Sequence, residues 1–199
     1  DLKDPNAYNP ERSKQLLAED GWKDTDGDGI LDKDGKPLTF DFVVYNSRAE
    51  LPLYAEAVQA DLKKVGIDMK IKTVDYNLID KMGQDGDYDM LISNIVTANT
   101  GDPIWFLANY WHTNDNGSNP QNGSGYSNPQ VDQLLDAAET EFDPAKRRDY
   151  AIQIQQLLMN DGAALFLGYP KTNIVTGSYL KGAVMYPSDY YWITNKITK

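Results

Sequence analysis

Apolar residues alternate with polar ones along three stretches of the chain, and this spacing of two is typical of β-strands. The stretches cover residues 38–45, 67–74 and 88–93. Between the first two, residues 51–65 repeat their apolar positions at helical spacing, and Gly66 ends that helix. A strand, a helix and a strand in this order predict a parallel pair of strands with a right-handed crossover. A short helix over residues 76–81 would bring the third strand into the same sheet.

Four further helices are predicted from the way they begin. An Asn or Asp followed by Pro is a typical helix start, because the side chain caps free N–H groups and Pro fits the first helical position. Such pairs begin at Asn9, Asp102, Asn128 and Asp143. The first of these helices ends at Gly21, and the last two cover residues 129–140 and 144–160. The remaining predictions are a loop over residues 22–37 and short β-like runs at 164–167 and 173–176.

The composition excludes several classes of protein. Nineteen Lys and Arg against 30 Asp and Glu give a net charge of -11, which argues against nucleic acid as a partner. The absence of Cys rules out disulfides and thiolate metal sites, and one His is too few for a multi-His zinc site. The sequence contains no phosphate-binding loop, dinucleotide fingerprint or nucleophile elbow. No apolar run reaches the roughly 20 residues of a membrane helix.

An Asp- and Gly-rich stretch has the ligand spacing of a calcium-binding loop. Oxygen ligands alternate along such loops, and a Gly makes the sharp turn. The matching residues here are Asp24, Asp26, Asp28, Ile30 and Asp32. The twelfth position, which should hold a bidentate Glu, is Gly35. The stretch is interpreted either as a weakened calcium site that staples the loop or as a solvated acidic turn.

The loop after the third predicted strand is the expected ligand-binding region. It contains the polar and Gly residues Thr97, Asn99, Thr100, Gly101 and Asp102. In open parallel sheets, ligands bind beyond the carboxyl ends of the strands, and a helix N-terminus after the loop adds backbone amides. The aromatic residues that follow, Trp105 and Phe106, are expected to belong to the core, with an apolar wall of the ligand site as the alternative.

His112 is the single histidine of the chain and stands among polar residues near carboxylates. Its imidazole could bind a transition metal or a metal chelate, and a packing or surface role is the alternative. A pair of carboxylates could also serve hydrolysis, but 30 acidic residues give many pairs and no spacing singles one out.

Several motifs, taken in their order along the chain, resemble the extracytoplasmic solute-binding proteins of ABC importers, in the peptide and nickel branch. They are Asn9-Pro10-Glu11 through Gly21-Trp22, Gly35-Lys36-Pro37-Leu38, Tyr88-Asp89-Met90, Gly101-Asp102-Pro103, Gly125-Tyr126-Ser127-Asn128-Pro129 with Val131-Asp132, Asp143-Pro144-Ala145-Lys146-Arg147-Arg148, and Tyr169-Pro170-Lys171. Each motif is short. Their shared order over essentially the whole chain carries the resemblance.

This resemblance implies an α/β fold, namely a type II periplasmic-binding-protein-like lobe with a mainly parallel sheet and helices on both faces. Residues 1–178 would form the C-terminal ligand-binding lobe, and the tail 179–199 would cross back to a missing N-terminal lobe. The implied role is capture of a small-molecule ligand outside the cytoplasmic membrane, in the periplasm or as a cell-surface lipoprotein. The ligand would pass to the membrane permease of an ABC importer, with no catalysis and no required cofactor.

The resemblance also bears on the ligand. In nickel binders a His after the Asp-Pro pair contacts the metal complex, and His112 stands in roughly that place. Tyr126 is the second flanking side chain expected to contact the ligand. The Trp residues that line the chelate in some relatives are replaced here by Val96 and Thr97. The expected ligand is a nickel chelate, with nickel as part of the ligand, or an oligopeptide. A calcium-dependent structural or adhesion module is the alternative function, and a carboxylate hydrolase is the third.

Overall fold

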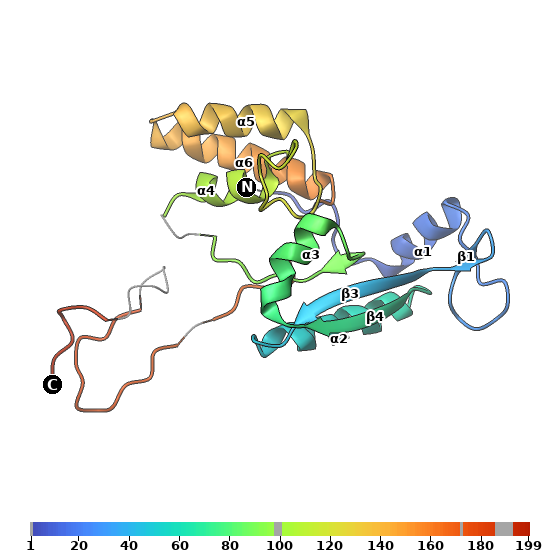
Figure 1. The fold of residues 1–199 in the computed structure, drawn as a ribbon, viewed down its shortest axis with the longest axis horizontal. Helices are drawn as coiled ribbons and strands as arrows, with labels where there is room; N and C mark the ends of the chain where they lie inside the picture. The colour runs from blue at the N-terminus through green and yellow to red at the C-terminus, as the bar shows by residue number, and fades with distance from the viewer. Residues whose placement is uncertain (1, 98–100, 172, 186–192) are drawn as a thin grey trace.

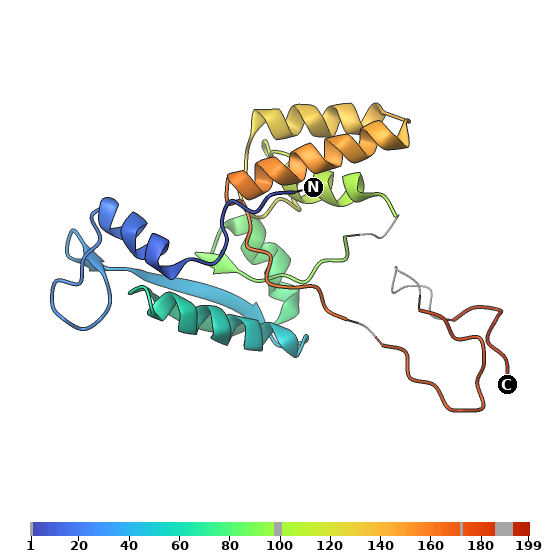
Figure 2. The ribbon, with the colours of Figure 1, turned by 180° about the vertical axis from the view of Figure 1, so that it is seen from behind.

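The computed structural model describes residues 2–97, 101–171, 173–185 and 193–199. It has two layers, a small parallel sheet with its helices and a bundle of three helices stacked beside it (Figure 1). The segment that follows the last helix first passes the sheet, where Leu167 packs, and then runs away from both layers in each of the two opposite views (Figures 1 and 2). None of the helices in the described ranges is long and apolar enough to cross a membrane.

The amino-terminal part begins with the predicted capped helix. Helix α1 covers Pro10–Glu19, and the Asn9 side chain accepts a hydrogen bond from the backbone N–H of Arg12. The region 22–37, predicted as a loop, contains a small antiparallel hairpin of β1 (Asp32–Lys33) and β2 (Lys36–Pro37). The hairpin forms because both residues of its two-residue turn adopt positive φ, 53° at Asp34 and 72° at Gly35.

The parallel β-α-β unit predicted from the sequence is confirmed. Strand β3 (Thr39–Tyr45) and strand β4 (Asp68–Val74) run parallel, and α2 (Glu50–Lys63) connects them. The four residues between α2 and β4 include Gly66 at φ 84°, where an added Cβ would lie 2.6 Å from a Leu31 side-chain carbon. Gly is therefore required there both for the backbone turn and for the close contact.

The third strand joins the other edge of β3 and is shorter than predicted. After the 3-10 turn η1 (Tyr76–Leu78) and α3 (Ile79–Asp85), only Met90–Leu91 pairs as β5, which gives the strand order β4-β3-β5. One cause is the Asp89 side chain, because its carboxylate accepts the Asp41 backbone N–H at 2.8 Å in place of a strand partner. The prediction of one shared sheet is confirmed, while the predicted length of this strand is wrong.

The helix layer consists of α4 (Pro103–Trp111), α5 (Pro129–Thr140) and α6 (Pro144–Asn160). Each begins at a side chain that accepts a backbone N–H, as the Asp-Pro and Asn-Pro pairs predict. The three helices share one apolar cluster, made of Ile104, Leu107, Trp111, Val131, Leu135, Ala138, Ala151, Ile154 and Leu158. Trp105 stays partly exposed, while Phe106 packs against the rim of this cluster, so the core expectation holds for Phe106 alone.

The sheet has a separate apolar cluster, and a close backbone contact joins the two layers. The sheet cluster centres on Val43, Val44 and Tyr45 with α2 and α3 packed against it. Between the layers, Gly83 of α3 lies against Gly123 of the loop before α5, so close that an added Cβ on Gly123 would come within 3.0 Å of the Gly83 Cα. This contact helps fix how the helix layer sits beside the sheet.

The predicted β-like runs at 164–167 and 173–176 are not strands in the described residues. The sequence pattern there favours a strand, but these runs pair with neither β4 nor β5, the two outer strands of the described sheet. Leu167 instead packs against the sheet cluster, and the one pairing in the described tail is an isolated antiparallel bridge between Lys181 and Thr198. Large apolar side chains of the tail are exposed: Leu165, Phe166, Tyr169, Val175, Tyr179, Val184, Met185 and Ile193.

Candidate functional site

The carboxyl ends of β3 and β5 carry a polar network that sequence reasoning missed. The buried hydroxyl of Tyr45, the last residue of β3, accepts the backbone N–H of Asn94 at 3.0 Å. The Asn94 side-chain amide donates to a Glu50 carboxylate oxygen at 3.4 Å. Burial, as the largest cause, raises the pKa of Tyr45. Position alone could have found these residues, because ligands of open α/β sheets bind at this edge.

An exposed aromatic ring lies next to this network. Tyr76, in η1 directly after β4, packs edge-to-face on Tyr45 with ring centroids 5.1 Å apart. Its side chain is 56% exposed, so it offers an apolar face to anything bound beyond the strand ends. Arg48 is also exposed in the loop after β3. Together these residues provide ring stacking, amide and charged contacts of the kinds that hold a peptide or a chelate.

The predicted ligand loop reaches the helix layer through Asp102. Thr97 and Gly101 are exposed, while Asn99 and Thr100 lie outside the described residues. Asp102 caps α4, since its Oδ1 accepts the backbone N–H of Ile104 at 3.0 Å. Its other carboxylate oxygen accepts from Arg147 of α6. Asp102 therefore has at least two partners inside the protein, and its role as a ligand contact stays a prediction.

Arg147 is a further residue that sequence reasoning did not single out as part of the site. Its guanidinium donates to the carbonyls of Ala138 and Glu141, the latter at 2.9 Å, as well as to the Asp102 carboxylate. A cation near the amino end of a helix is unfavourable next to the helix dipole. That placement, four residues after the Asp143 cap, is the sequence signal that could have pointed to a specific partner for Arg147.

His112 lies at the opposite end of α4 from the loop. It is the residue after the last of the helix, about 15 Å along the axis from Asp102 at 1.5 Å per residue. Both ring nitrogens face acceptors of the protein itself: Nδ1 lies 3.3 Å from the Thr113 carbonyl and Nε2 lies 3.3 Å from Asp136. Partial burial lowers the pKa of His112, but these acceptors and Asp132 outweigh it, so the pKa is raised from 6.5.

Tyr126 also points into the helix layer. Its ring packs edge-to-face on Trp111 at 5.8 Å, and its hydroxyl donates to Asp161 at 2.7 Å. Burial and this hydrogen bond raise the pKa of Tyr126 to about 12. Thr97, Gly101 and Asp102 thus lie before the amino end of α4, while His112 and Tyr126 lie with the elements at its carboxyl end. Those of the predicted ligand residues that the structure describes are therefore not gathered into one cluster.

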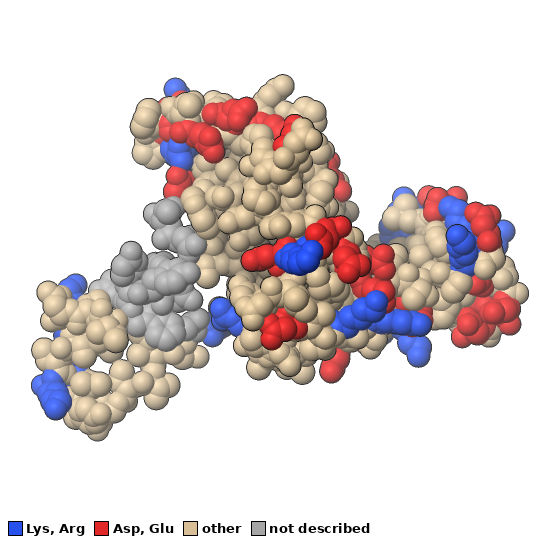
Figure 3. Space-filling view, in the orientation of Figure 1, with Lys and Arg blue, Asp and Glu red and all other residues tan. Residues whose placement is uncertain are grey.

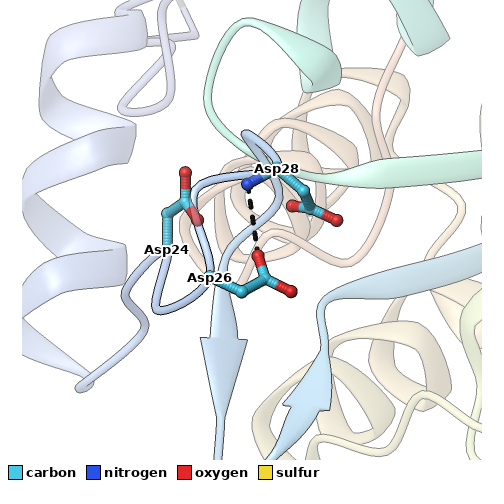
Figure 4. A group of neighbouring side chains, drawn as sticks. All are labelled: Asp24, Asp26 and Asp28. Carbon is cyan, nitrogen blue, oxygen red and sulfur yellow. Dashed lines mark hydrogen bonds between the residues drawn. The ribbon is translucent and has the colours of Figure 1, made fainter.

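The Asp-rich loop lies between α1 and β1, by the amino end of the sheet (Figures 1 and 4). Carboxylate oxygens of Asp24, Asp26 and Asp28 lie within 4.8 Å of one another. Each carboxylate also accepts backbone N–H groups of the loop, and Ile30 donates its N–H to Asp28 at 2.7 Å. Asp32 instead accepts from Thr25. Three of the five predicted calcium ligands are therefore brought together, and calcium binding stays a prediction.

The surface of the lobe reflects the net charge of -11. In the view of Figure 3, acidic side chains gather along the helix layer and over the loop that joins α1 to β1, with basic side chains interspersed. Several of the basic groups are neutralised in exposed ion pairs, such as Lys33 with Asp20 at 2.9 Å and Lys64 with Asp61 at 2.6 Å. Such exposed pairs contribute little to stability.

Comparisons with known proteins agree on one family. Residues 1–118 match the model of the bacterial extracellular solute-binding proteins, family 5, middle region. Over 187 residues, 90% of the chain, it is 32% identical to the oligopeptide-binding protein AppA of Bacillus subtilis. The chain spans about a third of that protein's length (33%).

Solved structures agree with the sequence matches. The structure of Bacillus subtilis AppA in complex with a nonapeptide aligns with 94% of this chain and 37% of its own, with a TM-score of 0.77 and 30% identity. The structure of NikA from Staphylococcus aureus in complex with Ni(L-His)2 aligns with 81% of the chain and 32% of its own, with a TM-score of 0.67 and 27% identity. The periplasmic-binding-type α/β fold expected from the sequence is confirmed.

Proposed function

The chain belongs to the family 5 bacterial extracellular solute-binding proteins, and from this premise we propose that it is the C-terminal, ligand-binding lobe of an ABC importer's binding protein. It captures its ligand outside the cytoplasmic membrane and delivers it to the membrane permease. Its action is binding without catalysis and needs no resident cofactor. The observation that carries the proposal is the polar edge at the carboxyl ends of β3 and β5, with the Tyr45–Asn94 hydrogen bond and the exposed Tyr76 ring beside it.

An oligopeptide is the ligand class that the observations favour. The structure of AppA that resembles this chain contains a nonapeptide. The strand-end edge offers the Asn94 amide, the Glu50 carboxylate and the Tyr76 ring, which suit a peptide backbone and its side chains. The His112 ring, in contrast, already faces acceptors at both nitrogens, so a metal would have to displace one of them.

A nickel chelate is the second candidate. The chain is 26% identical over 99% of its length to the nickel-binding protein NikA of Staphylococcus aureus, and the structure of that protein contains Ni(L-His)2. A chelate with its own histidine ligands could bind through the polar strand-end edge without any metal ligand from this chain. In that case nickel belongs to the ligand rather than to the protein.

The tail is proposed to pack against a first lobe. Residues 1–178 form the ligand-binding lobe in this proposal, and residues 179–199 cross back to the other lobe. The large apolar side chains that this tail leaves exposed support it, with Tyr179 at 65% and Ile193 at 91% exposure. Apolar surface of this kind is stabilised by burial against another part of a protein.

A thermal-shift titration of the full-length gene product tests the proposal. The probes are a pool of nonapeptides, nickel with and without free histidine, and calcium alone. A ligand that binds only the folded state raises the melting temperature with its saturation. We expect a shift with peptides, or with nickel–histidine as the second candidate. A shift with calcium alone would favour the alternative, a calcium-dependent module built on the Asp24–Asp32 loop, which draws no support from the relatives named above.

A further inference from the structure

Arg147 joins three elements of the helix layer through one side chain. From α6, its guanidinium donates to two carbonyls at the carboxyl end of α5, those of Ala138 and Glu141, and to the Asp102 carboxylate that begins α4. The side chains of Arg147 and Asp102 are 23% and 39% exposed, so both are shielded in part from water. Charge-assisted hydrogen bonds in such surroundings are stronger and more directional than neutral ones.

Asp102 stands where the chain passes from the strand-end loop into α4. One oxygen of its carboxylate caps the helix by accepting the Ile104 N–H, and the other is held by Arg147. Because the cap fixes the first turn of α4, a partner that fixes the cap also fixes the first turn. The position of Gly101, the preceding residue, is then set relative to α5 and α6.

We propose that Arg147 is a positioning residue for ligand capture. By holding Asp102, it sets the place of Gly101 and of the first turn of α4 at the edge of the lobe where the ligand binds. This inference rests on the proposed function. Asp102, predicted from the sequence as a ligand contact, serves here as the anchor through which Arg147 acts.

The arrangement requires an arginine. The planar guanidinium carries five donors and reaches three acceptors at once, whereas an ammonium group is a point charge that cannot span them. Arg148, the next residue, is a matched control. It is exposed, and within the described residues its side chain makes no hydrogen bond or ion pair.

The test compares variants of the full-length gene product in titrations with the nonapeptide pool and with the nickel–histidine complex. We expect R147Q and R147K to weaken binding by about fivefold or more, within the usual range of coupling between sites. R148Q should bind as the wild type does. Removing the anchor as well, in D102N/R147Q, should add little to R147Q alone, because both residues act through one contact.

A control separates positioning from a general loss of stability. Ile154 of α6 is fully buried in the apolar cluster that α4, α5 and α6 share. I154V therefore lowers the stability of the helix layer and leaves the contacts of Arg147 in place. Hydrogen exchange at the Ile104 N–H, which the Asp102 cap holds, should rise in R147Q and stay at the wild-type rate in I154V. Should R147Q fail to fold, D102N, which keeps an acceptor for the cap but loses the charge pair, takes its place.

Two results overturn the inference, and they are distinguishable. If the wild type binds a probe and R147Q binds it equally well, or is weakened no more than I154V, Arg147 is a purely structural residue. If the wild type binds none of the probes, the proposed function itself fails and the inference fails with it.

Discussion

Gly123→Ala is expected to destabilise the fold, whereas the same change at its neighbour Gly83 is expected to stabilise it. A Cβ on Gly123 would lie 3.0 Å from the Cα, 3.2 Å from the carbonyl carbon and 3.3 Å from the carbonyl oxygen of Gly83. All three atoms are backbone, so no side chain can rotate away. The layers must separate by a few tenths of an ångström, which also strains the bond from the Tyr88 hydroxyl to the Gly123 carbonyl.

The magnitude follows from the geometry. Overpacking of this kind lowers the free energy of unfolding by about 1–3 kcal/mol. For a chain of this size, each kcal/mol lost lowers the melting temperature by about 2–4 °C. In Gly83→Ala the new Cβ would lie 3.6 Å from the Gly123 Cα, which is an ordinary contact. Gly83 is inside α3, where Ala is preferred over Gly, so a gain of up to about 1 kcal/mol is expected.

Urea denaturation of both variants and of the double variant measures these effects. The midpoint should fall in G123A and rise in G83A at an unchanged slope, since the slope reports the surface exposed on unfolding. The double variant should be less stable than the two single effects add up to, because each new methyl group lies against the backbone of the other residue. A neutral G123A, or equal effects at the two positions, would refute the close backbone contact as the joint between the layers.

Three further predictions concern caps and titrating groups. Asp143→Ala removes the acceptor for two backbone N–H groups of α6 and should cost about 1 kcal/mol in a thermal melt, with Asp149→Ala of the same helix as a near-silent control. The pKa of His112 is raised from 6.5 in the folded protein, so its contribution to the free energy of unfolding is complete at low pH and is lost as the pH rises through the folded pKa. H112Q should lose this pH dependence of stability. An unchanged stability profile in H112Q would contradict the contacts of the ring. Hydrogen bonds from Tyr126 and Asn128 lower the pKa of Asp161 from 3.8. Their contribution to the free energy of unfolding is therefore present above pH 3.8 and lost as the pH falls through the folded pKa. Tyr126→Phe should make the loss of stability at acidic pH less steep.

Local signals in the sequence predicted most elements of the fold. The Asn128-Pro129 and Asp143-Pro144 pairs place the starts of α5 and α6 at the right residue, because capping is decided within a few residues. The length of the third strand was overestimated, because the sequence pattern could not show that the Asp89 side chain would accept the Asp41 N–H in place of a strand partner. The tail runs were misjudged for a related reason, because a β pattern forms a strand only where the chain runs alongside a partner strand, and Leu167 instead packs its side chain against the sheet cluster.

The candidate site was only partly predictable. The rule for strand ends directs attention to the loop before α4, but spacing along the chain could not show that α4 separates that loop from His112. Tyr45 and Arg147 escaped notice because their roles depend on tertiary partners, Asn94 in one case and Asp102 in the other. A resemblance of short motifs supplied the family, since order over the whole chain holds information that no single motif contains.

Native mass spectrometry of the full-length gene product tests the central claim most directly. The protein is sprayed after purification, and again after incubation with the nonapeptide pool, with nickel–histidine, or with calcium. We predict that peptide adducts of one ligand per protein appear and that Y76A, which removes the exposed ring at the strand-end edge, reduces them. A protein that stays free of peptide and of nickel chelate under all of these conditions would contradict a role in solute capture.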